Sequence, residues 1–424
     1  MWMNDRGVVW PRILSMRERA ALSRRILGER LDTVLPMAMR AARIDMWLVL
    51  CHEDNHDPVF DTLMPDDVWC PILQMLIFHD RGEAEGVEGI NLSMTNPGGF
   101  YEKPWNGTDP AEQWDLLAKL VTERDPQRIG IDTGPVQWAS DGLTYGLYSR
   151  LLRTMPGPYG ERLVGAEPLS ERWLATLCET EVTVFSHVVA VAKAIIAECY
   201  GSAVLVPGVT TATDLEWHYR QRVADLGIDV SFKPFFSRVR SNAMRECYGA
   251  DDAPIRPGDF VHCDVGIRYL GLCSDHQQWA YVRRPGETEA PEGMRSLLRE
   301  ANRLQDVFIS RFREGMTGNE LLADILTTAR EAGVPNPKVY SHSLGRLLHE
   351  PGPLIGLPWE QQCVAGRGDV RLHDRQAFTM ELSVGGPVAE WDGQEVRLSI
   401  EEDVVFEGGT CRVIHGRQTE FHLL

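Results

Sequence analysis

The sequence predicts an α+β protein of two domains, a smaller α/β domain at residues 1–170 and a larger domain at residues 171–424. Three observations lead to this prediction. In the first part, apolar strand-like runs alternate with amphipathic helical patterns. In the second part, one helix–helix–strand pattern occurs twice. The strands that follow carry acidic residues on one face and apolar residues on the other.

The first domain is predicted from four strand-like runs and three helical patterns. The predicted strands are Met46–Cys51, Ile72–Phe78, Ile90–Met94 and Ile129–Asp132. The predicted helices are Ser15–Met39, Pro110–Glu123 and Gln137–Arg153, and the domain closes near Leu163–Leu169. We recognise no phosphate-binding glycine motif in this part. The polar residues Asp54, His56 and Asp57, which follow the first strand, are interpreted as a loop rather than a site.

The second domain contains a unit of two helices that is repeated. The first copy has helices at Glu181–Cys199 and Leu215–Leu226, and the second at Gly293–Arg313 and Leu321–Ala332. The glycines before the second helix of each copy, and those at its end, are separated by nearly the same offset. This offset predicts a pseudo-twofold domain, with a chance likeness of amphipathic segments as the alternative.

The stretch Asp259–Trp279 holds two carboxylates that we expect to converge. Asp264 lies on a strand with apolar residues at alternate positions, and Asp275 follows a second extended run. Their odd spacing would direct them to opposite faces of a straight strand. Gly266 and Gly271 are expected to bend the chain between them, so that both side chains reach one face.

Two later strands repeat this arrangement. Glu381 and Glu401 each lie on a predicted strand whose opposite face is apolar, and His342 and His349 precede them. Four clustered carboxylates would carry four negative charges, which two divalent cations would neutralise. An oxygen-rich site with a single histidine favours manganese and tolerates iron, cobalt or zinc. Solvated acids on unrelated strands are the alternative.

These residues resemble the metal site of the creatinase, aminopeptidase P, prolidase and methionine aminopeptidase superfamily, whose catalytic domain has the pita-bread fold. The resemblance covers residues 170–424, and the first domain is also similar to that of the creatinase and prolidase branch. The matching motifs are Asp264-Val265-Gly266, Ser274-Asp275, His342 with Gly345 and His349, Glu381 after an apolar strand, and Ile400-Glu401 with Asp403.

The resemblance implies a hydrolase with two metal ions. It implies that Asp275 and Glu401 bridge the ions, while Asp264 holds one ion and His342 with Glu381 holds the other. A metal-bridging water would then attack an amide carbonyl. The resemblance gives Glu381 the role of proton acceptor, and His349 that of hydrogen-bond donor to the oxyanion.

The sequence departs from the family around this predicted centre. Peptidases of the family follow the bridging Asp with x-Thr-Arg-Thr, where this chain has the segment His276–Trp279. Two family histidines and one arginine are replaced by Cys247, Lys338 and Ser399. The family uses these positions to contact substrate or to orient ligands, so prolyl specificity stays open. The candidate pocket residues are His262, Gln277, Gln278, Lys338 and Arg397.

Three functions remain compatible with these residues. The first is an Xaa-Pro aminopeptidase-like or dipeptidase-like hydrolase of short peptides. The second is a metal-dependent lyase acting on a small zwitterion; the similar dimethylsulfoniopropionate lyases have an acid where this chain has His262. A packed His262 without a role in chemistry is the alternative at that position, and His276 is expected to point away. The third function is a binding protein that kept the fold but lost catalysis.

Composition narrows the class of protein and its partners. The 424 residues include 43% hydrophobic and 25% charged residues, as in ordinary globular proteins. A net charge of −18 disfavours nucleic acid and anionic membranes as partners. We recognise no signal peptide and no segment of transmembrane length. Nine scattered cysteines predict a reducing, cytoplasmic location, and the resemblance implies a homodimer.

Overall fold

The computed structural model describes residues 10–249 and 251–424, which fall into two compact units. The N-terminal unit comprises residues 14–181 and 350–352, and the C-terminal unit comprises the other described residues. The boundary expected at residue 170 lies inside helix α5 (Glu167–Ala175). This helix belongs to the N-terminal unit because it packs against α1, whose Arg30 donates to backbone carbonyls of Trp173 and Thr176.

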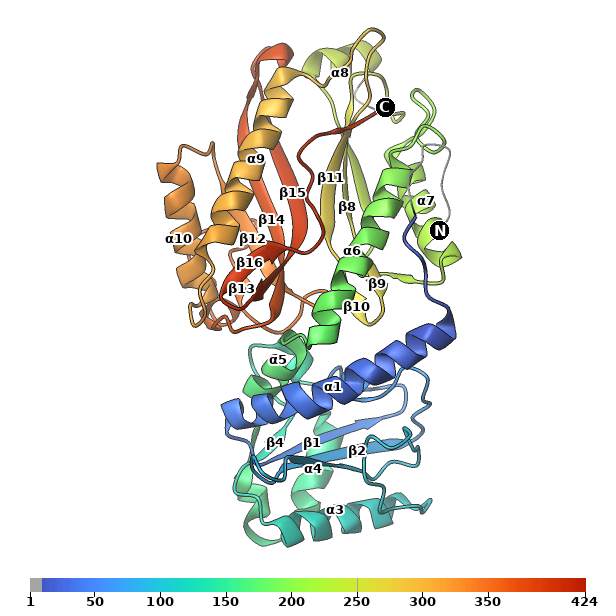
Figure 1. Cartoon of the computed structure of the whole chain (residues 1–424), viewed down its shortest axis with the longest axis vertical. Helices are drawn as coiled ribbons and strands as arrows, with labels where there is room; N and C mark the ends of the chain where they lie inside the picture. Colours follow the sequence, from blue (N-terminus) through green and yellow to red (C-terminus); the bar gives the residue numbers. More distant parts are fainter. Residues whose placement is uncertain (1–9, 250) are drawn as a thin grey trace. The chain divides into compact units, whose positions relative to one another are not determined.

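A five-stranded mixed sheet forms the centre of the N-terminal unit, in the order β3-β2-β1-β4-β5. Its strands are β1 (Met46–His52), β2 (Leu73–Asp80), β3 (Val87–Asn91), β4 (Ile129–Ile131) and β5 (Leu163–Gly165). The other α-helices of this unit are α1 (Met16–Ala42), α2 (Phe60–Leu63), α3 (Pro110–Arg124) and α4 (Tyr145–Thr154). Every strand predicted here overlaps an observed one (Figure 1). The helix expected from Gln137 begins only at Tyr145, because the Thr144 hydroxyl caps it there.

Two buried carboxylates, Asp57 and Asp132, interact with each other in the N-terminal unit. Asp132 accepts hydrogen bonds from Trp47 Nε1 and Ser170 Oγ, both at 2.9 Å, and Asp57 accepts one from the backbone N–H of Val59. Oδ2 of each acid is buried and has none of these partners. Burial and the charge of Asp132 raise the pKa of Asp57 to about 9, and burial also raises the pKa of Asp132. We expect the two acids to share one proton, which would give both Oδ2 atoms a partner.

This acid pair predicts that the N-terminal unit loses stability as the pH rises. The pKa of Asp57 is higher in the folded chain than the ordinary value near 3.8, so its contribution is complete below that value and is lost as pH rises through about 9. Asp57→Asn keeps a donor toward Asp132 and removes the titration. We expect the variant to have the higher urea midpoint at pH 8 and a flatter pH profile. Parallel profiles for the two proteins would contradict the shared proton.

The C-terminal unit is built on a large, mostly antiparallel sheet with the central order β13-β12-β14-β15-β11-β8-β7; of its described strands only β17 pairs in parallel, with β11. Strands β16 and β17 extend it beside β15 and β11, and β10, β9 and β6 form a small separate sheet. The first strands are β6 (Asp229–Val230), β7 (Phe235–Val239), β8 (Phe260–Val265), β9 (Ile267–Tyr269), β10 (Leu272–Cys273) and β11 (His276–Tyr281). The later ones are β12 (Lys338–Leu344), β13 (Leu354–Ile355), β14 (Gln376–Val388), β15 (Gln394–Glu407), β16 (Thr410–Val413) and β17 (His422–Leu423).

The predicted repeat is present in the helices of this unit. These helices are α6 (Glu179–Cys199), α7 (Ala212–Asp225), α8 (Asn242–Tyr248), α9 (Glu292–Arg311) and α10 (Gly318–Glu331). Capping boxes begin α7 at Thr211 and α10 at Thr317. The glycines that follow these helices, Gly227 and Gly333, have φ of 61° and 74°, a left-handed conformation that glycine adopts without strain. The second helices of the two copies, α7 and α10, therefore start and stop by the same local chemistry.

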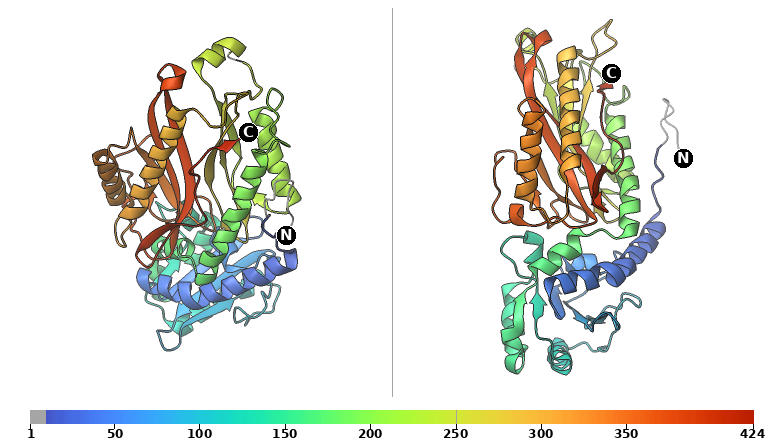
Figure 2. Two further views of the ribbon diagram at one scale, coloured as in Figure 1. Left: turned by 45° about the horizontal axis from the view of Figure 1, so that its top comes forward. Right: turned by 60° about the vertical axis from the view of Figure 1, so that its left-hand side comes forward.

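Helices α9 and α10 cover the apolar face of the central strands β14 and β15. Apolar side chains of α9 and α10 pack with Met380 and Leu382 of β14 and with Leu398 and Ile400 of β15. Figures 1 and 2 show α9 lying along these strands, with α10 beside it. Because strand side chains alternate between faces, the residues between these apolar positions point away from the helices.

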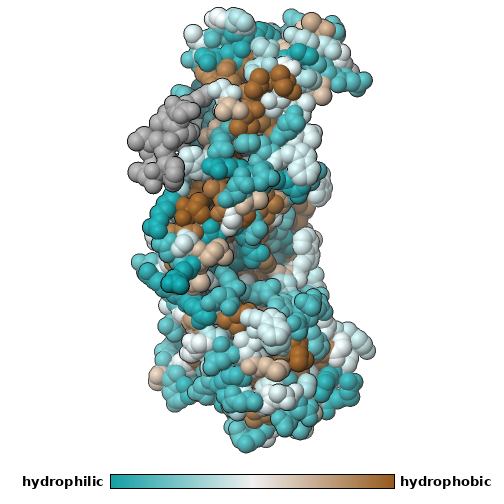
Figure 3. Space-filling model, turned by 90° about the vertical axis from the view of Figure 1, so that its right-hand side faces the viewer, coloured by the Kyte–Doolittle hydropathy of each residue, from teal (hydrophilic) through white to brown (hydrophobic). Residues whose placement is uncertain are grey.

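Helix α6 corrects one expectation from the sequence, because its 21 residues are long and apolar enough to span a membrane. Core helices of globular proteins meet the same criterion. Lys193 of α6 forms a 2.5 Å ion pair with Glu402, and Tyr200 after its end donates to the backbone of Val261 and Gln278. These polar contacts attach α6 to the sheet. On the face drawn in Figure 3, hydrophobic side chains form separate patches among hydrophilic ones.

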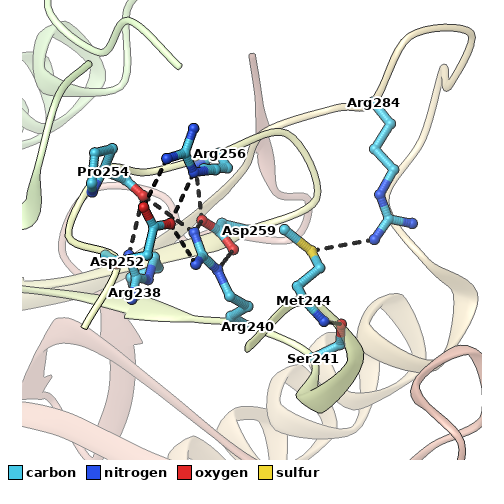
Figure 4. Close-up of polar contacts among 9 residues, drawn as sticks. All are labelled: Arg238, Arg240, Ser241, Met244, Asp252, Pro254, Arg256, Asp259 and Arg284. Atoms are coloured by element: carbon cyan, nitrogen blue, oxygen red, sulfur yellow. Dashed lines mark hydrogen bonds and ion pairs between the residues drawn. The ribbon is translucent and has the colours of Figure 1, made fainter. Parts of the chain in front are cut away.

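A network of ion pairs between arginines and acids holds together the segment that connects β7 to β8 (Figure 4). Buried Arg240 binds both carboxylate oxygens of buried Asp259 at 2.6 Å. It also contacts Oδ2 of Asp252 at 2.8 Å, and Arg256 binds the same acid at 2.7 and 2.8 Å. These bidentate pairs join the end of β7 to the start of β8, the strand that carries Asp264.

Candidate metal centre

The predicted carboxylates lie in one row across the sheet. Strand pairing sets Asp264 opposite Gln277, Gln277 opposite Glu401, and Glu401 opposite Glu381. The row ends at Tyr340, which is opposite Glu381. Residues directly opposite each other on antiparallel strands point to the same face. These five residues, here called the ligand row, therefore share the face away from α9 and α10.

Asp275 joins this face because the chain folds back on itself after β8. Leu270 and Gly271, with φ of 55° and 77°, make the tight turn between β9 and β10. At Gly266, a Cβ atom would lie 2.0 Å from the carbonyl oxygen of Ser274, so only glycine allows the returning chain to approach there. The bends expected at these two glycines are confirmed. They explain how two aspartates with an odd spacing reach one face.

Three of the predicted ligands form a compact buried cluster. One ligand atom each from Asp275, His342 and Glu401 lies within 4.8 Å of the other two. Nδ1 of His342 lies 3.0 Å from the carbonyl oxygen of Ser343 and donates to it, which leaves the lone pair of Nε2 on the side of Asp275, 3.8 Å away. Asp275 Oδ1 and Glu401 Oε1 are buried without a hydrogen-bond partner. A divalent cation would satisfy these atoms, so the cluster fits a metal.

Asp264 and Glu381 lie on either side of this cluster and are half-buried. Burial raises the pKa of Asp264 to about 6, and burial together with the charge of Asp264 raises that of Glu381 to about 7. Burial and mutual repulsion also raise the pKa values of Asp275 and Glu401 well above the usual range. Four acids that oppose one another's ionisation would be stabilised in their charged form by divalent cations bound among them.

His349 is the exposed neighbour of this buried cluster. Its ring centroid lies 4.5 Å from that of His342. Although His349 is exposed, partial desolvation of its ring and the positive charge of Arg367 lower its pKa, which favours the neutral ring at pH 7. A neutral imidazole at the rim of the cluster can donate a hydrogen bond to a bound molecule.

The candidate pocket residues do not all reach the same face. Gln277 lies in the ligand row, where its Nε2 is 3.0 Å from Glu401 Oε2 and its Oε1 is 3.0 Å from Nε2 of His262. Burial lowers the pKa of His262 to about 4, so this ring is neutral. Gln278 points to the opposite face and contacts His422 at 2.9 Å, because neighbouring residues of a strand alternate. His276 is likewise buried on that other face, as expected.

Lys338 and Arg397 line a cavity that opens beside Glu381. The cavity has a volume of about 140 Å³, and Tyr340, Ser383 and Ser399 also line it. Lys338 Nζ donates to the carbonyl oxygen of Pro358, and Arg397 donates to Ser383 Oγ and the carbonyl oxygen of Asn336. Both cations thus have neutral acceptors here and keep their charge available to an anion.

Tyr340 and Asp403 are site residues that sequence reasoning did not single out as functional. Tyr340 belongs to the ligand row, and its position two residues before His342 on one strand was the available signal. Asp403 accepts the backbone N–H of Asp275 at 3.3 Å, which holds the turn that carries this ligand. No sequence pattern links Tyr340 with Asp403, since the two residues lie on separate strands.

A family model described as metallopeptidase family M24 matches residues 185–407, more than half of the chain. The chain belongs to metallopeptidase family M24. As an M24 protein it is a metal-dependent hydrolase of the peptidase class, and the resemblance seen in the sequence is confirmed. The matched residues include every predicted metal ligand.

Solved structures of M24-like fold resemble nearly the whole chain. An X-Pro aminopeptidase from Thermotoga maritima MSB8 has a TM-score of 0.62 and 16% identity, covering 92% of this chain and 100% of that one. An Xaa-Pro dipeptidase from Bacillus anthracis has values of 0.59 and 19%, with 95% and 100% covered. A dipeptidase from Pyrococcus horikoshii OT3 has values of 0.58 and 18%, with 93% and 100% covered. At such identities the likeness shows the α+β pita-bread fold alone. A search of curated proteins found no match.

Proposed function

We propose that this chain is a dinuclear-metal peptidase that cleaves an amide bond in a short peptide, as a dipeptidase or Xaa-Pro aminopeptidase does. One observation carries the proposal. Asp275, His342 and Glu401 form a compact buried cluster, and Asp275 and Glu401 each have an oxygen atom without a hydrogen-bond partner. Asp264 and Glu381 lie in the same row of paired strand residues as Glu401. Two divalent ions, with manganese favoured, match the charge and the oxygen-rich donor set.

In this proposal Asp275 and Glu401 hold both ions, Asp264 holds one, and His342 with Glu381 holds the other. Bound divalent ions lower the pKa of a water and polarise an amide carbonyl. Glu381 is half-buried at the edge of the cavity, where it can take a proton from water and pass it to the leaving amine. His349 can donate to the carbonyl oxygen as negative charge develops there.

The cavity beside Glu381 suggests which end of the substrate lies there. A cavity of about 140 Å³ is close to the roughly 150 Å³ that holds a benzene molecule, so it suits one residue. Lys338 and Arg397 would bind a carboxylate on that residue. We therefore propose that the leaving residue enters this cavity with its free carboxylate. Gln277 lies further along the ligand row, where His262 of β8 contacts it.

The test compares dipeptides that differ only at the C-terminus. Lys338→Met and Arg397→Met are expected to raise KM for the free dipeptide about tenfold to a hundredfold, since a charged hydrogen bond contributes about 1.5–3 kcal/mol. The amidated dipeptide should respond little. Lys119→Met, which removes an exposed lysine of the N-terminal unit, is the control. Equal effects on both peptides would contradict carboxylate binding in this cavity.

Metal removal tests the hydrolase itself. Treatment with a chelator should abolish release of amino acids from Xaa-Pro and other dipeptides, and Mn²⁺ should restore it with close to two ions per chain. No release from any peptide, together with turnover of a small zwitterion, would favour the lyase instead. We also propose a cytoplasmic homodimer; no disulfide joins any of the nine cysteines, all of which lie in the described residues, and this agrees with a reducing compartment.

A further inference from the structure

Gln277 is a neutral amide in the middle of a row of acids, and it contacts one of them directly. Its Nε2 lies 3.0 Å from Glu401 Oε2. Glu401 Oε1 is buried and has no hydrogen-bond partner. The contact with Gln277 therefore determines how the carboxylate of Glu401 is rotated. Gln277 is only 3% exposed, so water cannot easily replace it.

The chemistry of these groups determines which atom donates and which accepts in each hydrogen bond. An ionised carboxylate only accepts hydrogen bonds, so Gln277 turns its NH₂ group toward Glu401 and its carbonyl oxygen toward His262. Nε2 of His262 then carries the proton that is donated to Gln277 Oε1, 3.0 Å away. The ring of His262 lies against Trp279, with centroids 4.8 Å apart, which keeps Nε2 directed at the amide.

We infer that Gln277 is a positioning residue for Glu401, and that His262 acts on the metal centre only through Gln277. The inference rests on the proposed metal centre. A ligand whose orientation is held by a hydrogen-bonded neighbour loses less freedom when it binds a cation, and removing such a neighbour typically weakens metal binding about 10- to 100-fold. His262 supplies no ligand atom in this arrangement. It holds the side-chain amide of Gln277, which in turn holds the carboxylate of Glu401.

Strand β11 provides a matched control for this inference. The next residue, Gln278, contacts Nε2 of His422 through its own Oε1 at 2.9 Å. Gln278 is also buried, at 5% exposure, but it points to the opposite face of the sheet. The two glutamine–histidine pairs have the same chemistry and similar burial, and only one of them contacts a predicted ligand.

The experiment measures the affinity of the full chain for Mn²⁺ by competition with a chelator. Gln277→Met keeps the length of the side chain and should weaken Mn²⁺ binding about 10- to 100-fold. His262→Phe keeps the ring and should weaken binding by a smaller factor. The double variant should bind no more weakly than Gln277→Met alone, because His262 has no other route to the metal. Gln278→Met and His422→Phe should leave Mn²⁺ affinity unchanged.

Two results would overturn the inference: additive losses in the double variant, or a loss in Gln278→Met equal to that in Gln277→Met. Should Gln277→Met fail to fold, as judged by circular dichroism, the two histidine variants decide. A loss confined to His262→Phe supports the inference, and equal losses in His262→Phe and His422→Phe overturn it. Wild-type protein that binds no Mn²⁺ would contradict the proposed metal centre itself, and this inference with it.

Discussion

Asp275→Asn is expected to lower kcat/KM for a cleaved dipeptide by about two to three orders of magnitude and to weaken Mn²⁺ binding strongly. Asparagine offers one uncharged carbonyl oxygen where the centre needs a carboxylate. Removing one partner from a buried group of charges costs about 3–5 kcal/mol, and each 1.4 kcal/mol corresponds to a factor of ten. Steady-state kinetics and metal analysis of the same preparation measure both effects.

The metal-free protein should respond to Asp275→Asn in the opposite direction. Asp275 is buried beside Glu401 and is repelled by Asp264 and Glu381, so the neutral side chain relieves repulsion when no cation is present. Urea unfolding with excess chelator should therefore show a more stable variant, and unfolding with Mn²⁺ a less stable one. Asp229→Asn, at an exposed acid on β6, should change neither. A variant with wild-type Mn²⁺ affinity would remove Asp275 from the centre.

Arg240→Met is expected to have the largest effect on stability, lowering the free energy of unfolding by about 3–5 kcal/mol. The variant would leave the carboxylate of Asp259, which is fully buried, without the guanidinium that contacts both of its oxygens. An uncompensated buried charge is more costly than the absence of the whole pair. Urea unfolding of the full chain, followed by tryptophan fluorescence, measures the change.

Two further variants test whether burial of the charges, rather than ion pairing alone, sets the loss in free energy of unfolding. Arg256→Met should cost no more than about 1 kcal/mol, because Arg256 is partly exposed and Arg240 remains beside Asp252. Arg240→Met with Asp259→Leu should recover much of the loss, since neither charge is then left alone. Equal losses for Arg240→Met and Arg256→Met would show that burial does not set the size of the effect.

Much of the metal centre could be predicted because its ligands lie on regular strands. Alternation along β14 and β15 was sufficient to place Glu381 and Glu401 opposite the apolar residues, and the core packing agrees. The matched glycines likewise predicted where α7 and α10 end, since a helix end depends on residues only a few positions apart. Short-range periodicity is readable in a sequence because side-chain direction follows from backbone geometry.

Other features depended on contacts that the sequence does not order. Gln277 and Gln278 were equal candidates, and only the pairing of β11 with β8 and β15 assigned one to the ligand row. The domain boundary was expected too early because the packing of α5 on α1 is a long-range contact. Helix α6 was not recognised as long and apolar enough for a membrane, and its ion pair between Lys193 and Glu402 appears only in the folded chain.

The sequence by itself determined which residue types are available and which strand face each of them occupies, because strand periodicity is a local property. The tertiary structure decided which faces meet, that Gln277 rather than Gln278 contacts Glu401, and that Asp57 and Asp132 share a buried site. All three outcomes have the same physical reason. Burial and electrostatic repulsion depend on distances between residues far apart in the chain, and strand register sets those distances.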